Sequence, residues 1–99
     1  MNKTIKKLER NRFSILTDDL SVCYVCGKPK DDLHEIFEGK NRVRSMQDGM
    51  VLPVCRSCHN KLHSNREMAL VFKRIAQKKY LDSHSTEQFV KRFGRNYLI

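Results

Sequence analysis

The chain has 99 residues, of which 20 are Lys or Arg and 11 are Asp or Glu, so its formal charge is +9. A chain of this length forms one domain with a modest core. Its 39% hydrophobic residues, without Trp, favour a fold that a bound metal helps to stabilise. The charge indicates a polyanionic partner, nucleic acid ahead of an anionic membrane.

No stretch approaches the roughly 18 apolar residues of a membrane span. The N-terminal residues also lack the apolar core of a signal peptide. We therefore expect a cytoplasmic protein with no membrane partner, whose thiols remain reduced.

The first third of the chain predicts an arm and a metal-binding turn. Residues 3–12 have a basic, weakly helical pattern typical of a short helix, and residues 13–16 favour a short extended segment. Cys23-Tyr24-Val25-Cys26, followed by Gly27, is typical of a zinc knuckle, in which a tight turn presents both sulfurs.

Two short strands are expected next. Residues 33–37 alternate partly between apolar and polar side chains, and a loop with Gly and Asn signals follows at 38–42. The apolar run 50–54 predicts a second strand that leads into the second cysteine pair, and Pro53 marks it as an edge or a strand end.

Three helices are expected after the second strand. The first runs from residue 56 to about 63, and Ser64-x-x-Glu67 has the spacing of a capping box that opens a longer helix. A second box, Ser85-x-x-Gln88, predicts a short helix ended by Gly94, and residues 95–99 are expected to dock as a strand. One stripe of the longer helix is expected to pack in the core: Met68, Val71, Phe72, Ile75 and Ala76.

The four cysteines predict a structural zinc site. They form two matched Cys-x-x-Cys pairs, Cys23 with Cys26 and Cys55 with Cys58. In a reducing compartment, two such pairs indicate one tetrahedral zinc ion held by four thiolates rather than disulfides.

Three histidines are expected to lie together beside this zinc. His59 and His63 are one turn apart on the expected helix, so their imidazoles share a face. Because both cysteine pairs must meet at one metal, the segment between them doubles back and brings His34 beside that helix. His59 and His63 can then grip one divalent cation, and a residue on the facing strand can complete the site. Alternatively, His59 or His63 enters the zinc shell or faces solvent; His84 is expected to be an ordinary histidine.

The order of these motifs carries a family resemblance. Cys-x-x-Cys, then His34-Glu35 on a strand, then Cys-x-x-Cys-His-x-x-x-His resembles the HNH endonucleases of the ββα-metal class. The run 33–42 looks like small HNH proteins common in bacteriophages, as do the residues that follow it: Ser45, Gly49 and Val54-Cys55.

The resemblance covers about residues 20–65 and implies a fold as well as a location. We expect a small α+β protein with a zinc-clamped ββα-metal (HNH) fold, carrying additional C-terminal helices over about 66–99. The whole chain, 1–99, would be a single HNH nuclease domain. A phage-encoded protein of this kind would act in the host cell.

The resemblance also implies a mechanism. A strand histidine deprotonates water, the hydroxide attacks a DNA phosphate, and one divalent ion (Mg²⁺, Mn²⁺, Zn²⁺ or Ni²⁺) stabilises the developing charge. Carried onto this chain, His34 is the base, His59 and His63 are metal ligands, and Glu35 is the strand ligand. Because family members usually place the ligand just before the base, the reverse assignment of His34 and Glu35 stays open.

The family's loop asparagine has no direct counterpart here. It usually lies shortly before the second cysteine pair, where this chain has Asp48-Gly49-Met50, so Asn41 is expected to hold the loop by another route. Basic side chains on the loop and around the helix are expected to contact phosphates, with a solvated charged face as the alternative: Lys40, Arg42, Arg44, Arg56, Lys61 and Arg66.

These observations favour an enzyme that cuts DNA, in double-stranded form. The main rival is a zinc-ribbon module that binds nucleic acid without cutting, and such a module has no need of His34, His59 and His63 together. A zinc-stabilised protein-interaction adaptor would instead predict an exposed apolar patch rather than excess positive charge.

Overall fold

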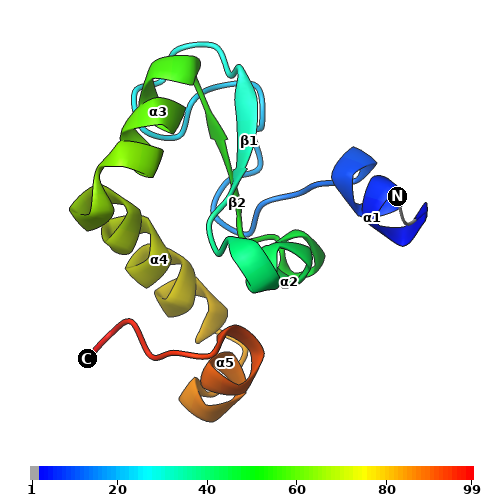
Figure 1. Cartoon of the computed structure of the whole chain (residues 1–99), viewed down its shortest axis with the longest axis vertical. Helices are drawn as coiled ribbons and strands as arrows, with labels where there is room; N and C mark the ends of the chain where they lie inside the picture. Colours follow the sequence, from blue (N-terminus) through cyan, green and yellow to red (C-terminus); the bar gives the residue numbers. More distant parts are fainter. Residues whose placement is uncertain (1–2) are drawn as a thin grey trace.

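The computed structural model describes residues 3–99 (Figure 1). These residues form an α+β domain, as expected, with five α-helices, one 3₁₀ helix and a two-stranded antiparallel sheet. None of these helices is long and apolar enough to cross a membrane. In chain order the elements are α1 (Lys3–Arg10), β1 (Asp32–Glu35), η1 (Gly39–Asn41), α2 (Arg42–Asp48), β2 (Val51–Val54), α3 (Arg56–Ser64), α4 (Arg66–Tyr80) and α5 (Thr86–Phe93).

The two strands are shorter than expected but occur where the sequence predicts them. Asp32 pairs with Val54 and Glu35 pairs with Val51, so β2 returns the chain directly to the second cysteine pair. All four residues of β2 are buried, whereas in β1 only His34 is. Pro53 is tolerated because each strand of a two-stranded sheet has one unpaired edge.

The segment between the strands is helical, which corrects the expected loop. Residues 39–41 form a 3₁₀ turn and residues 42–48 form α2, so Lys40, Arg42 and Arg44 lie on helices. Gly49 ends α2 with φ of 73°, and a Cβ atom there would lie 2.5 Å from Cε2 of Phe13. Only glycine satisfies both the left-handed backbone and this close approach.

The longer helix begins one residue later than the predicted capping box. Asn65 caps α4 by accepting a hydrogen bond from the Met68 amide at 3.0 Å, and Ser64 is the last residue of α3. Since a single residue joins the two helices, Ser64 is already helical and cannot cap. On α4, Ala76 is buried as expected, but Val71 is 47% exposed and does not belong to the core.

The C-terminal part confirms one prediction and corrects another. The capping box of Ser85 and Gln88 is complete, and Gly94 ends α5 in a left-handed conformation. The tail that follows forms no strand. It runs back beside α4 (Figure 1), where the Tyr97 amide donates to Oε1 of Gln77 at 2.8 Å and Nε of Arg74 donates to the Tyr97 carbonyl at 3.0 Å.

Candidate metal centres

The four cysteine sulfurs converge on one point. Their Sγ atoms all lie within 4.8 Å of one another, and those of Cys26 and Cys55 are 3.6 Å apart. Cys55 also caps α3, because its sulfur accepts from the Cys58 amide at 3.5 Å. The Tyr24 amide donates to the Pro53 carbonyl at 2.8 Å, which ties the first knuckle to β2.

The charge state of these thiols favours a bound cation. Burial, together with hydrogen bonds to the other three thiols, raises the pKa of Cys58 to about 12. Burial also opposes ionisation of Cys23, but hydrogen bonds from backbone amides, those of Cys55 and Cys26 among them, outweigh it and lower that pKa to about 6. Four thiolates cannot coexist here without compensation, so the group has the chemistry of a site that could hold zinc.

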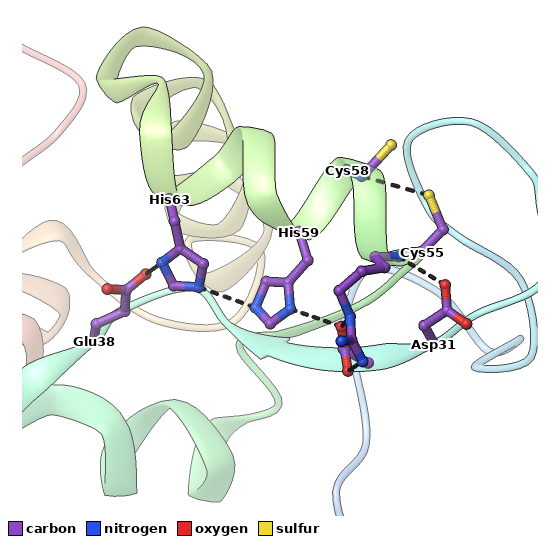
Figure 2. A network of polar contacts seen from close by, with 8 residues as sticks. Asp31, Glu38, Cys55, Cys58, His59 and His63 are labelled. Carbon is purple, nitrogen blue, oxygen red and sulfur yellow. Dashed lines mark hydrogen bonds and ion pairs between the residues drawn. The ribbon is translucent and has the colours of Figure 1, made fainter.

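A second group joins the three predicted histidines. His34 of β1 meets His59 and His63 of α3, and one ring nitrogen from each lies within 4.8 Å of the others. Nε2 of His59 and Nε2 of His63 are 3.1 Å apart (Figure 2). His34 is only 4% exposed, whereas the His63 side chain is 53% exposed, so the group is open on one side.

Asp32 orients His59 and was missed by the sequence analysis. Its Oδ2 lies 3.0 Å from Nδ1 of His59, and hydrogen bonds from His59 and Arg56 hold the pKa of this carboxyl below its usual range. The ionised carboxylate keeps the His59 proton on Nδ1, so the lone pair of Nε2 faces His63. The alternation of a strand places Asp32 and His34 on the same face, and that signal was available in the sequence.

The environment of His34 keeps its imidazole neutral. Burial lowers its pKa to about 4, and repulsion from the nearby basic groups of His59, His63 and Lys73 opposes a proton on His34 in the same direction. A neutral ring offers a lone pair to a metal, so the three histidines together present a nitrogen donor set.

Glu35 is not brought to the histidines. Its Oε1 accepts a hydrogen bond from Nη2 of Arg12 at 2.6 Å, and Nη2 of Arg42 lies 3.5 Å away. Because side chains alternate along a strand, Glu35 points to the opposite face from His34. Its position therefore does not support the expected role of strand ligand.

Glu38 lies beside the histidines although the resemblance assigned it no role. Its Oε1 is 3.9 Å from Nε2 of His34 and 3.8 Å from Nδ1 of His63 (Figure 2), and its side chain is 53% exposed. Glu38 follows β1 in a loop, and the path of that loop depends on the helix behind it, so spacing alone could not have placed this residue.

Two polar residues fix the segment that follows β1. Oγ of Ser45 donates to the Phe37 carbonyl at 2.7 Å and accepts from the Phe37 amide at 3.1 Å. Asn41 instead reaches α5, where its Nδ2 donates to the Phe93 carbonyl at 3.0 Å. Ser45 thus holds the chain beside the site, while Asn41 ties that chain to the C-terminal helix.

Of the six basic residues expected to contact phosphates, three contact other side chains of the protein and three form no ion pair in the part of the chain that the structure describes. Arg42 pairs with Glu9 at 2.8 Å, and Nε of Arg56 pairs with Oδ2 of Asp32 at 2.8 Å. Arg44 donates to Oδ1 of Asn41 at 3.3 Å. Within residues 3–99 no ion pair forms at the remaining three: Lys40, Lys61 and Arg66.

Comparisons of this chain with protein-family models, with curated proteins and with solved structures found no match.

Proposed function

We propose that this protein is a metal-dependent endonuclease of the HNH type that hydrolyses phosphodiester bonds in double-stranded DNA. The observation that supports it most directly is the meeting of His34, His59 and His63 on a strand and a helix. The motif order of the zinc-clamped HNH fold agrees with it, as does the charge of +9.

In this proposal the cysteine group holds a structural zinc ion and the histidine group holds the catalytic divalent ion. The donor set fits the second ion, because His34 is kept neutral and Asp32 directs the lone pair of His59 inward. His34 is then a ligand, as in the reverse assignment that the sequence left open, but Glu35, the base of that assignment, is engaged by Arg12 and Arg42. A divalent ion bound there supplies a Lewis acid for the phosphate and its leaving oxygen.

We assign the general base to Glu38. Its carboxylate lies on the open side of the histidine group, where it can accept a proton from the attacking water. Glu35, the other carboxylate near this part of the chain, is engaged by Arg12 and Arg42 on the opposite face of β1. Glu38→Gln is expected to lower the cleavage rate about 100-fold or more, whereas Glu35→Gln leaves the open side intact. Equal losses in both variants would reject this assignment.

The test of the function itself is a cleavage assay on supercoiled plasmid with a panel of added divalent ions: Mg²⁺, Mn²⁺, Zn²⁺ and Ni²⁺. Wild-type protein is expected to nick or linearise the plasmid, and His34→Ala is expected to abolish cleavage while the zinc content of the cysteine group persists. His84→Ala is the matched control, because His84 is exposed, stacks on Tyr80 and belongs to neither the cysteine group nor the histidine group. Cleavage by His34→Ala at the wild-type rate would contradict the proposal.

The rival function is a zinc module that binds nucleic acid without cutting it. It predicts DNA binding by the wild-type protein but no cleavage with any ion of the panel, and no effect of His34→Ala on binding. The same preparations therefore decide between the two functions.

A further inference from the structure

A basic pocket lies between α4 and the C-terminal tail. Its volume is about 240 Å³, and it is lined on α4 by Arg66, Glu67 and Lys73 and on the tail by Arg95 and Tyr97. Three cations thus face one carboxylate in a small hollow. Most of its charge comes from residues that no motif in the sequence singled out.

The cations of this pocket lack carboxylate partners. In the part of the chain that the structure describes, no Asp or Glu oxygen lies within 4.0 Å of Arg66, Lys73 or Arg95. Other arginines of the protein are neutralised, for example Arg92, which pairs with Asp48 at 2.6 Å. Cations that gather without counter-charges repel one another, and an anionic ligand relieves that repulsion.

The pocket is held in shape by the tail. The ring of Tyr97 lies 5.7 Å from Nζ of Lys73 and 5.0 Å from Cζ of Arg95, so both cations are placed over one aromatic ring. The Tyr97 backbone is fixed in turn by fully buried Gln77 and by Arg74. Lys73 and Arg95, which come from distant parts of the sequence, are therefore brought together by a supported structure.

The pocket begins close to the histidine group along the chain. Arg66 begins α4 three residues after His63, the open end of the candidate centre. A polymer with regularly spaced negative charges can occupy both places at once.

We infer that the pocket formed by Arg66, Lys73, Arg95 and Tyr97 binds a backbone phosphate of the same DNA strand that the proposed function places at the histidine group. The inference rests on the proposed function, since it names a second contact of the same substrate. Such a contact carries no base specificity, but it fixes the register of the strand over the site.

The experiment measures binding without cleavage. Zinc-loaded protein and a short fluorescent duplex are titrated by anisotropy with no added divalent ion, over a series of salt concentrations. The pocket variant is Lys73→Gln/Arg95→Gln. Its control is Lys78→Gln/Lys91→Gln, which removes the same charge from exposed lysines of α4 and α5 outside the pocket. Lys73→Arg/Arg95→Lys exchanges the two side chains but keeps both charges, so it tests whether the charge of the pocket is sufficient for binding.

The pocket variant is expected to bind about tenfold more weakly than the control, with a salt slope lower by about 1, as for one lost phosphate contact. The charge-conserving variant is expected to bind like wild type. Equal weakening in pocket and control variants, equal weakening in the charge-conserving variant, or no duplex binding by the wild type would each overturn the inference. If wild type binds in this way but cuts no plasmid, the nuclease proposal fails and the pocket stands.

Discussion

The cysteine group and the histidine group meet on one short helix, yet they are built differently. Cys58 and His59 are neighbours on α3 (Figure 2). The cysteine sulfurs face one another as a closed set of four, whereas the three imidazoles leave one side open toward the half-exposed Glu38. Closed four-ligand sites are typical of structural metals, and open three-ligand sites are typical of catalytic ones.

The two groups also depend on each other unequally. The cysteine group joins the first knuckle to the start of α3, and β2, which pairs with the strand that carries His34, leads directly into the second cysteine pair. The histidine group joins only α3 and β1, which are already held together. Loss of the cysteine group should therefore remove both sites, whereas loss of one histidine should remove only the second.

The largest effect is expected from Cys58→Ser. Structural zinc contributes on the order of 10 kcal/mol in small domains, which is comparable with the whole stability of such a fold. The variant should lose zinc and unfold, as measured by metal analysis and circular dichroism. His63→Ala is the matched control on the same helix and should stay folded. A Cys58→Ser variant that stays folded without zinc would contradict the structural role of the cysteine group.

A smaller effect is expected from pH through His34. The folded-state pKa of about 4 lies below the ordinary 6.5, so folding favours the neutral ring. The stabilisation is complete above about pH 6.5 and is lost as pH falls toward 4, by about 3 kcal/mol in all. The test is urea unfolding of wild type and His34→Gln, with no catalytic ion and with zinc content monitored. If the free energy of unfolding changes with pH in the same way in both proteins, His34 is not the group that causes the pH dependence.

Asp32→Asn should act on the histidine group alone. Loss of the carboxylate that orients His59 is expected to weaken Ni²⁺ or Mn²⁺ binding there about 10- to 100-fold, with no change in zinc at the cysteines. Calorimetric titration of the zinc-loaded protein measures this. Asp31→Asn is the control, because Asp31 accepts from the Arg56 amide at 2.7 Å rather than from a histidine. A similar loss in both variants would argue against the orienting role.

The smallest effect is expected from Arg56→Gln. Arg56 pairs with Asp32 near both groups, but its side chain is 68% exposed, and exposed ion pairs contribute little. Affinity at the histidine group should fall no more than about threefold. A loss as large as that of Asp32→Asn in the same titration would mean that the ion pair, and not the carboxylate itself, positions His59.

Residues that act through local chemistry were predicted well. The spacing of His59 and His63 places them on one helix face, and the capping box of Ser85 with Gln88 needs only the first turn of α5. Predictions that depended on contacts between segments distant in the sequence were less successful. Turn signals predict a loop at 38–42, yet residues 39–41 form a 3₁₀ turn and residues 42–48 form a helix, which Ser45 bonds to Phe37.

The sequence by itself thus determined the candidate ligands and their spacing, two cysteine pairs and two helical histidines, together with an excess of positive charge. Only the tertiary structure decided which side chains face them. It turned Glu35 toward Arg12, brought Glu38 to the open side, and placed Lys73 beside Arg95. The reason is that helix spacing and turn chemistry act within a few residues, whereas the facing of a strand and the path of a tail depend on the packing of distant segments.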